Sequence, residues 1–366
     1  ATMNELNLKV NISYGDSSLS EESANNLSLF VLWGVLLPLV AAAGLLGNVL
    51  TMLVLWRREM NSTTILYMRG LVITDTGILL GSVLTLTPIA YFSNVIYPVI
   101  YTPGFYFVMT LQQINVWITV SVSVERYIAI CHPFRAARLI SKKKTLAAML
   151  GITLFSVLYN LPHLFATEAV SCPAAPGGQS GGCLQVTTTG FGQTEFYLSY
   201  REYMYLIIIY VLPFIALLIL NSFLIRELMT MQRRATSTGS KEENEANMSL
   251  VLILIVIVFI FCQTPGLLSQ FEVVPVSVFP TYLGVSNLLF ATNSAVNFLI
   301  YTAFGKRFRR VLLRLFRHLY TGKGSKRRRA SSASSCHAAL TQYSLSNAND
   351  AVEMERLPPQ YDTLVQ

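Results

Sequence analysis

Apolar residues dominate seven long stretches of the chain, and short polar segments separate these stretches. A helix needs about 20 predominantly apolar residues to cross the hydrocarbon core of a membrane. Each stretch reaches that length. The pattern therefore predicts an all-α membrane protein, a seven-transmembrane helix bundle with spans at about 28–56, 65–92, 104–130, 145–167, 203–225, 248–271 and 279–304.

The same pattern divides the chain into four parts. An N-terminal segment, 1–27, is polar and precedes the bundle, 28–304. A short basic and apolar stretch, 305–320, predicts an amphipathic eighth helix on the membrane surface. The remaining residues, 321–366, are polar and predict a disordered cytoplasmic tail.

Composition and charge placement support a membrane protein with a defined orientation. Hydrophobic residues make up 53% of the chain and charged residues 13%, against about 25% charged residues in soluble domains. Only Lys9 and Arg201 lie in the segment 1–27 or the loops near 93–103, 168–202 and 272–278, and the other 25 of the 27 basic residues lie on the opposite side. Basic residues favour the cytoplasmic side. We therefore expect an extracellular N-terminus, a cytoplasmic tail and basic residues that face membrane lipids instead of nucleic acid.

The expected outer side carries acidic residues and glycosylation motifs. Eight acids lie there, namely Glu5, Asp16, Glu21, Glu22, Glu168, Glu195, Glu202 and Glu272. Such a surface is either a solvated acidic face or a mouth that attracts cationic ligands. Asn11 and Asn26 each begin an Asn-x-Ser motif on this side, so both are predicted to be glycosylated.

Several polar residues fall deep inside the predicted spans. Asp75 lies about 16 Å from the inner end of its helix, at 1.5 Å per residue. Asn115, Asn293 and Asn297 fall at comparable depths. These oxygen-bearing groups could bind a small hard cation such as sodium, or they could form a hydrogen-bonded network that only joins helices.

A second polar group marks the inner end of span three. Glu125, Arg126 and Tyr127 stand there, and Glu245 lies at the inner rim of span six. One arginine can bond two carboxylates and so tie two helices together. Pro213 and Pro265 predict kinks in spans five and six. The residues at helical spacing from Arg126, which share one face of span three, are Val108, Gln112, Asn115, Thr119 and Val122.

Together these residues resemble the rhodopsin-like (class A) G-protein-coupled receptors. The matching motifs are Gly47-Asn48, Leu71-Val-Ile-Thr-Asp75, Glu125-Arg126-Tyr127, Pro162, Pro213, Phe259-Ile-Phe-Cys262-Gln-Thr-Pro265 and Asn293-Ser-Ala-Val-Asn297-Phe-Leu-Ile-Tyr301. The resemblance covers about 28–320. Within the family, Glu125-Arg-Tyr-Ile-Ala-Ile-Cys-His-Pro133 and Phe155-Ser-Val-Leu-Tyr-Asn-Leu-Pro162 are most similar to invertebrate FMRFamide-type neuropeptide receptors.

The chain also departs from the family pattern. Gln263 stands where the family usually has a tryptophan, and Phe298 replaces the usual proline of span seven. Tyr101 stands where a cysteine normally opens span three, so the usual bridge to the second outer loop cannot form. Cys172 and Cys183 lie in that loop, on an oxidising side. We expect them to pair with each other, the alternative being two free thiols.

The resemblance implies a receptor that binds an extracellular neuropeptide and activates a heterotrimeric G protein, with no cofactor beyond the sodium ion and no enzymatic activity. Its switch would comprise the Glu125-Arg126-Tyr127 motif with Glu245, Pro265 and Tyr301. Its ligand pocket would open between spans three, five, six and seven, and the predicted lining is Val108, Met109, Gln112, Glu202, Tyr205, Gln263, Gln270, Phe271, Glu272 and Asn287. We expect the ligand to be cationic or amidated.

Other classes of membrane protein fit the sequence less well. An opsin would need a lysine in span seven, and an amine receptor an aspartate in place of Val108. A receptor of the same family for a non-peptide small molecule is the main alternative. A transporter or channel would show an internal repeat or several deep ionisable groups, and only Asp75 is of that kind.

The tail carries two interaction motifs. Arg328-Arg329-Ala330-Ser331 resembles a kinase site, and the serines clustered there are Ser331, Ser332, Ser334 and Ser335. Phosphates on them would add negative charge and recruit a basic partner such as arrestin, after receptor kinases act. Pro358-Pro359-Gln360-Tyr361 matches the PPxY ligand of WW domains.

Overall fold

The structure, a computed structural model, describes residues 25–91, 97–171, 184–234, 240–271 and 273–317. Within these ranges the side chains are described except at 90–91, 97, 232–234 and 240–246. The chain divides into two units, 1–309 and 310–366, and each is considered by itself. The helix 306–317 begins in the first unit and continues into the second.

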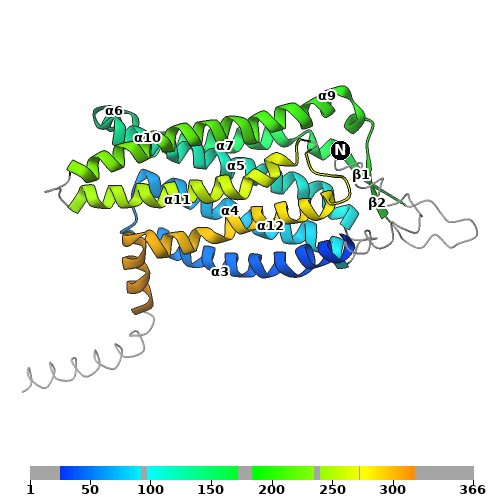
Figure 1. Ribbon diagram of the computed structural model, residues 1–366, viewed down its shortest axis with the longest axis horizontal. Coiled ribbons are helices and arrows are strands. Elements are labelled where there is room, and N and C mark those ends of the chain that lie inside the picture. Colours follow the sequence, from blue (N-terminus) through cyan, green and yellow to red (C-terminus); the bar gives the residue numbers. More distant parts are fainter. Residues whose placement is uncertain (1–24, 92–96, 172–183, 235–239, 272, 318–366) are drawn as a thin grey trace, which may run out of the picture. The chain divides into compact units, whose positions relative to one another are not determined.

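Seven helices of the first unit are long and apolar enough to cross a membrane, which confirms the predicted number of spans. They are Asn25–Leu55, Thr63–Ile89, Pro98–Cys131, Lys142–Ala166, Glu195–Met231, Asn247–Leu268 and Phe279–Phe304. They run side by side, with a β-hairpin at one end of the unit and the short helix α6 at the other (Figure 1). We call these the hairpin end and the α6 end.

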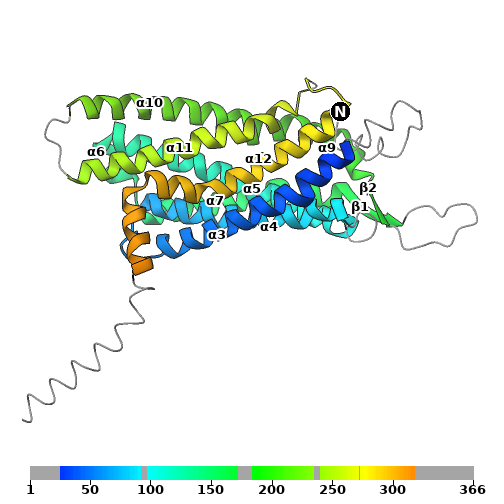
Figure 2. The same cartoon turned by 60° about the horizontal axis from the view of Figure 1, so that its bottom comes forward.

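The labelled helical elements follow the chain in the order η1 (Phe30–Leu36), α3 (Leu37–Leu55), α4 (Thr63–Tyr91), α5 (Tyr97–Cys131), α6 (Pro133–Leu139), α7 (Lys142–Asn160), α8 (His163–Ala166), η2 (Phe191–Gln193), α9 (Glu195–Ser199), η3 (Tyr200–Met204), η4 (Leu206–Val211), α10 (Leu212–Arg234), α11 (Ser240–Leu268) and α12 (Phe279–Phe304). The hairpin consists of β1 (Thr167–Ser171) and β2 (Leu184–Thr188), which pair antiparallel. Figure 2 shows α10 and α11 lying along the same direction as α12.

Span five begins eight residues before the predicted residue 203. Its first turn is α9, and the Thr194 hydroxyl caps it by accepting a hydrogen bond from the Tyr197 N–H at 3.3 Å. Polar residues such as Arg201 interrupt the apolar pattern there, so the sequence placed these turns in a loop. The π-helical segments η3 and η4 follow, and η4 ends just before Pro213. Such wider turns make room for the ring of Pro213, which would clash with the carbonyl one turn earlier and donates no hydrogen bond to it.

Small residues set the distance between neighbouring spans. A Cβ added at Gly77 of α4 would lie 2.4 Å from Cδ1 of Leu111, and one at Gly81 would lie 2.6 Å from Cγ2 of Val108. Both contacts are far below van der Waals distance, so only glycine lets α5 approach α4 this closely. Close approach through small residues is the usual way in which membrane helices pack.

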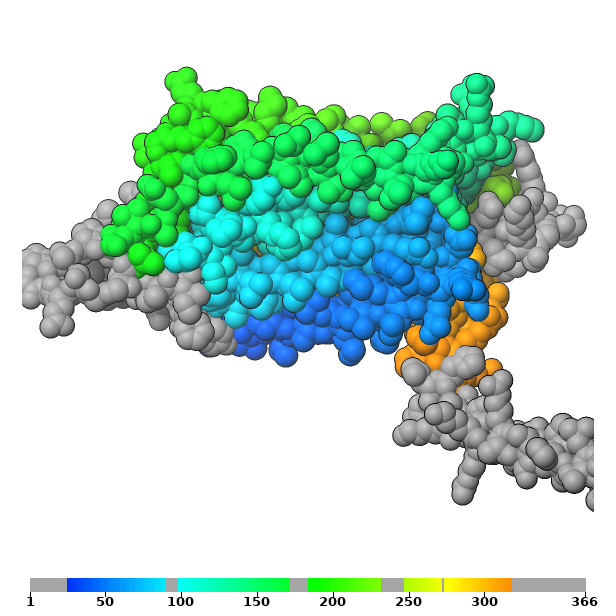
Figure 3. Space-filling model, turned by 180° about the vertical axis from the view of Figure 1, so that it is seen from behind, coloured from blue at the N-terminus to red at the C-terminus, as the bar shows by residue number. Residues whose placement is uncertain are grey.

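The outer faces of the spans are apolar. On α7, the side chains of Leu146, Leu150, Leu154 and Leu158 recur every fourth residue and are all exposed. Figure 3 shows a lateral face of the bundle on which α4 and α5 lie between α7 and α3. Exposed leucines at this spacing form a stripe that faces lipid in a membrane protein.

A further helix follows span seven, as predicted. Gly305 ends α12, and residues 306–317 form the next helix. Its residue Phe308 is buried and stacks on Tyr301 of α12, with ring centroids 5.5 Å apart. This contact lies within the first unit and fixes the start of the eighth helix against span seven.

Candidate functional site

Three polar groups lie along α5 between the hairpin end and the α6 end. We call them the amide pair (Gln112 and Gln263), the Asp75 cluster (Asp75 with Thr74, Asn115 and Asn297) and the Glu125 cluster (Glu125 and Arg126 with Thr63, Thr64 and Thr145). The face of span three predicted from helical spacing, from Val108 to Arg126, is buried throughout. The three polar groups are therefore connected through one buried face of α5, which we call the polar path.

The amide pair connects spans three and six. The Nε2 of Gln112 donates to the Oε1 of Gln263 at 3.3 Å, and each side chain is only 4% exposed. Nearer the hairpin end, the hydroxyl of Tyr205 lies 3.2 Å from the sulfur of Met109 and links spans five and three. The structure thus brings together four of the residues predicted to line a ligand pocket.

The other predicted pocket residues are spread more widely. Val108 is buried against Gly81 of α4. Asn287 is half-buried on α12, and Gln270 and Phe271 are exposed just beyond the end of α11. Their role in binding stays a prediction, and Glu272 lies outside the described residues.

Glu202 lies near the surface. Its side chain is 49% exposed, and its Oε1 is 3.8 Å from the guanidinium of Arg201. A carboxylate in this position is solvated and already has a basic neighbour. A ligand that pairs with it would therefore gain less free energy than at a buried site.

The Asp75 cluster lies deeper in the bundle. Asp75 is 1% exposed, and both of its carboxyl oxygens accept amide hydrogen bonds, Oδ1 from Asn115 and Oδ2 from Asn297, each at 2.8 Å. Asn115 also donates to Thr74 at 2.9 Å. Three of the four predicted sodium ligands therefore meet. Asn293 is buried as well, but within the described residues no hydrogen bond joins it to Asp75.

The chemistry of this cluster is compatible with a small cation. A carboxylate offers about four lone-pair sites; Asn115 and Asn297 donate to two of them, and Ser294 is a third hydrogen-bonding neighbour. Asp75 could therefore hold a sodium ion while the two amides orient its carboxyl group. The hydrogen-bonded network that we considered as the alternative is present in the same residues.

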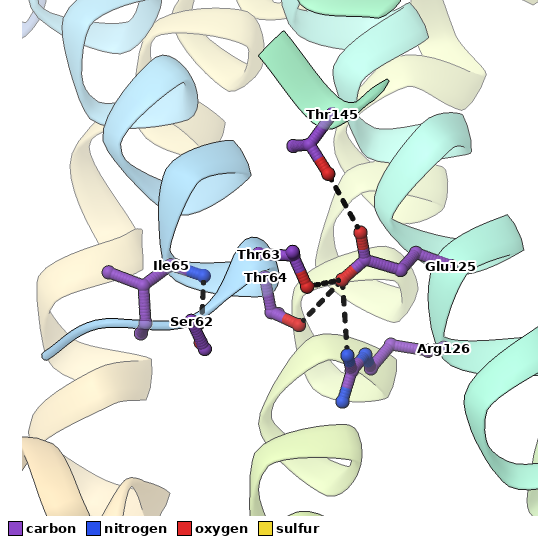
Figure 4. Close-up of polar contacts among 7 residues, drawn as sticks. All are labelled: Ser62, Thr63, Thr64, Ile65, Glu125, Arg126 and Thr145. Carbon is purple, nitrogen blue, oxygen red and sulfur yellow. Dashed lines mark hydrogen bonds and ion pairs between the residues drawn. The ribbon is translucent and has the colours of Figure 1, made fainter. Parts of the chain in front are cut away.

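The Glu125 cluster closes the path at the α6 end (Figure 4). Oε1 of Glu125 accepts from Thr63 at 2.7 Å, from Thr64 at 3.0 Å and from Arg126 at 3.1 Å. Its Oε2 accepts from Thr145 of α7 at 3.3 Å. Glu125 thus joins spans two, three and four, and the three threonines are partners that the sequence did not reveal.

The remaining switch residues lie at different levels of the bundle. The hydroxyl of Tyr127 lies 3.3 Å from Nε2 of His132. Tyr301 is buried against Phe308, and the carbonyl of Pro265 accepts from the hydroxyl of Tyr282 at 2.8 Å. The side chain of Glu245 lies outside the described residues, so its pairing with Arg126 stays a prediction.

Asn247 is a bridging residue that the sequence did not single out. Its Nδ2 donates to the carbonyl of Phe304, and its Oδ1 accepts from the N–H of Lys306, both at 3.0 Å. It therefore joins the α6 end of span six to the junction between span seven and the eighth helix. In the sequence, only its position two residues after the predicted switch residue Glu245 indicated a role for Asn247 at the α6 end.

Several predicted modification sites lie outside the described residues: Asn11, Cys172, Cys183, Ser331, Ser332, Ser334, Ser335 and the motif 358–361. Asn26 is described, and its side chain is exposed. Near the loop cysteines, Ser171 and Leu184 form the last described pair of the hairpin.

Comparison with known proteins identifies relatives of this arrangement. Residues 47–301 match the family described as "7 transmembrane receptor (rhodopsin family)". The chain is 31% identical to the FMRFamide receptor of Drosophila melanogaster over 80% of its length, 26% identical to the probable G-protein coupled receptor frpr-1 of Caenorhabditis elegans over 77%, and 27% identical to the FMRFamide peptide receptor frpr-18 of the same nematode over 62%.

The chain spans only part of these relatives. The aligned region covers 55% of the Drosophila receptor, 78% of frpr-1 and 52% of frpr-18.

Proposed function

The chain belongs to the rhodopsin family of seven-transmembrane receptors, and on that premise we propose that it binds an extracellular peptide and activates a heterotrimeric G protein. It is a multi-pass membrane protein and a receptor, not an enzyme. The observation that carries the peptide proposal is its similarity to relatives named as FMRFamide receptors. The buried polar path along α5 supports it by offering a route from a ligand to the α6 end.

The receptor of this proposal lies in the plasma membrane. Its hairpin end faces the outside of the cell, and its α6 end faces the cytoplasm. The support is the charge distribution along the sequence, since 25 of the 27 basic residues fall outside segment 1–27 and the loops that we assign to the outer side. The exposed Asn26 would then be accessible to glycosylation.

The ligand of this proposal is a cationic, C-terminally amidated peptide. The excess of acids on the outer side would attract a cation, and an amide cap removes a negative charge that this side would repel. Because Glu202 is half-exposed, we expect Glu202→Gln to weaken binding by less than about 1 kcal/mol. Glu272→Gln tests the other acid near the predicted pocket in the same way. A peptide in which citrulline replaces arginine tests whether the guanidinium contributes to binding.

The switch of the proposed receptor is the Glu125 cluster together with Glu245. Arg126 is buried, and its Nε has no hydrogen-bond partner among the described residues. A second carboxylate could satisfy that group and tie span six to span three. Release of the tie would let span six move and expose Arg126 to the G protein.

Sodium at Asp75 would favour the resting state of this switch. The ion would add positive charge beside the carboxyl group and so strengthen the packing of spans two, three and seven.

The tail would supply regulation: receptor kinases would modify Ser331 and its neighbours, arrestin would bind the phosphates, and a WW-domain protein would bind the motif 358–361. Basic residues at the α6 end would contact anionic lipids.

Two measurements test the proposed function. Cells that express the receptor are screened with a panel of neuropeptides that includes Phe-Met-Arg-Phe-amide, with calcium and cAMP as readouts, and membranes are assayed for guanine-nucleotide exchange. We expect an amidated, arginine-containing peptide to activate the receptor and to accelerate exchange. Activation by a small molecule alone, with no response to any peptide, would overturn the peptide proposal.

A further inference from the structure

The amide pair is an uncharged polar site buried beneath the rings of neighbouring spans. Gln112 and Gln263 are both 4% exposed. On the α6 side they rest on an apolar cluster that includes Val116 and Phe259, each one turn from one member of the pair. A buried amide is costly unless its hydrogen bonds are made, so the pair demands partners that the apolar cluster below cannot supply.

The hydrogen bond within the pair uses one of its four N–H donors and one of its two carbonyls. The carbonyl of Gln112 and the amide nitrogen of Gln263 make no hydrogen bond within the described part of the chain. If both amides were turned round, the pair would still leave one acceptor on one residue and one donor on the other.

We propose that the amide pair is the subsite for the terminal primary carboxamide of the peptide ligand, which deepens the proposed function and rests on it. A primary carboxamide carries one carbonyl acceptor and two N–H donors. It can therefore donate to Gln112 and accept from Gln263 at the same time. A third amide completes the hydrogen bonding of the first two.

A free terminal carboxylate does not fit the same subsite. It has no N–H to donate to the carbonyl of Gln112. Within the described residues, neither glutamine contacts a charged side chain through a hydrogen bond or ion pair. A negative charge would therefore enter the membrane interior without a counter-ion, which is strongly unfavourable.

Aromatic rings lie close to the next turn of α11 on the hairpin side of the pair. A Cβ added at Gly266, one turn from Gln263 towards the hairpin end, would lie 2.2 Å from Cζ of Phe290 and 2.8 Å from the hydroxyl of Tyr210. Tyr205 stands edge-on to Tyr210, with centroids 6.0 Å apart. An aromatic residue that precedes the carboxamide could pack among these rings while the carboxamide reaches the pair.

The test uses three forms of one peptide, Phe-Met-Arg-Phe with a terminal amide, methyl ester or free acid. The ester is neutral like the amide but donates no N–H, so it separates hydrogen bonding from charge. Potencies are measured on the full-length receptor in cells, for wild type, Gln112→Leu, Gln263→Leu and Gln113→Leu. The last is a matched control, because Gln113 is the adjacent glutamine but accepts from Asn160 of α7 at 2.7 Å.

On wild type we expect the amide to exceed the ester about tenfold, as one hydrogen bond allows, and to exceed the acid by about a hundredfold or more. Gln112→Leu should bring the amide close to the potency of the ester, because only the amide donates to the carbonyl of Gln112. Gln263→Leu should weaken both ligands about tenfold at equal surface expression and keep their ratio, since the carbonyl of each accepts from Gln263. Gln113→Leu should change neither potency. Comparing ratios removes differences in expression. Gln263→Lys, which adds a cation, should restore activity to the acid, a gain that misfolding cannot produce.

Equal potency of amide and ester on wild type would overturn the subsite while leaving the peptide receptor intact. So would an unchanged ratio in Gln112→Leu, undiminished potency of both ligands in Gln263→Leu, or an equal loss in Gln113→Leu. If no amidated peptide of the panel activates wild type, the proposed function and the subsite fail together.

Discussion

Gly47 of α3 lies directly against Phe298 of α12, and a Cβ added at Gly47 would be 2.9 Å from the Cβ of Phe298. Non-bonded carbon atoms prefer about 3.5–4.0 Å. Phe298 also stands edge-on to Phe308, with centroids 6.1 Å apart. The phenylalanine of span seven that replaces the family's proline is thus packed between span one and the start of the eighth helix.

We predict that Gly47→Ala destabilises the receptor, because the contact with a Cβ atom cannot be relieved by side-chain rotation. Overpacking of this kind costs about 1–3 kcal/mol. Gly151→Ala is the matched control, since a Cβ there has no atom within 4 Å and alanine favours a helix by about 1 kcal/mol. Thermal unfolding of the solubilised receptor checks both. An unchanged melting temperature for Gly47→Ala would contradict the packing.

Hydrophobic pattern was sufficient to predict all seven spans, because each needs only length and low polarity. Helical spacing also predicted the buried face of span three. Spacing cannot show how a neighbouring helix is rotated, however. The bond between Thr145 and Glu125, or between Asn247 and Phe304, depends on that rotation, so these partners emerged only from the structure.

The threonines around Glu125 should contribute to stability. We predict that Thr145→Val, which removes the hydroxyl and keeps the shape, costs about 1–3 kcal/mol, because a buried carboxylate loses a donor. Thr153→Val on the same helix is the control, since Thr153 donates only to the carbonyl of Met149 in its own helix at 2.9 Å. The two melting temperatures are compared, and equal values would show that Thr145 does not support Glu125.

Asn247 should restrain span six in the resting receptor. Its two bonds to the end of span seven and the following turn are each worth about 0.5–1.5 kcal/mol. We therefore predict that Asn247→Ala raises ligand-free nucleotide exchange several-fold at equal surface expression. Asn221→Ala is the control, because Asn221 donates to Leu217 of its own helix. Glu245→Ala should raise exchange in the same direction, and no rise in either switch variant would argue against a lock on span six.

Sodium dependence should follow the hydrogen bonds of the Asp75 cluster. We predict that sodium weakens agonist binding to wild type and that Asp75→Asn abolishes the effect. Asn297→Ala should reduce the effect more than Asn293→Ala, because Asn297 donates a hydrogen bond to Asp75 and, among the described residues, Asn293 does not. Agonist affinity is measured in sodium and in potassium at one ionic strength. Identical affinities on wild type would mean that the cluster only joins helices.

We predict a bridge between Cys172 and Cys183, which lie outside the described residues in the loop that follows Ser171 and precedes Leu184. The reason is that both cysteines fall in one outer loop, on an oxidising side. Span three cannot compete, because Tyr101 stands at its start and stacks on Phe105 at 5.7 Å. Mass spectrometry of the unreduced, digested receptor should find one peptide pair joined through Cys172 and Cys183, and Cys172→Ser should free one thiol at Cys183 alone. Two alkylated free cysteines in the unreduced wild type would contradict the bridge.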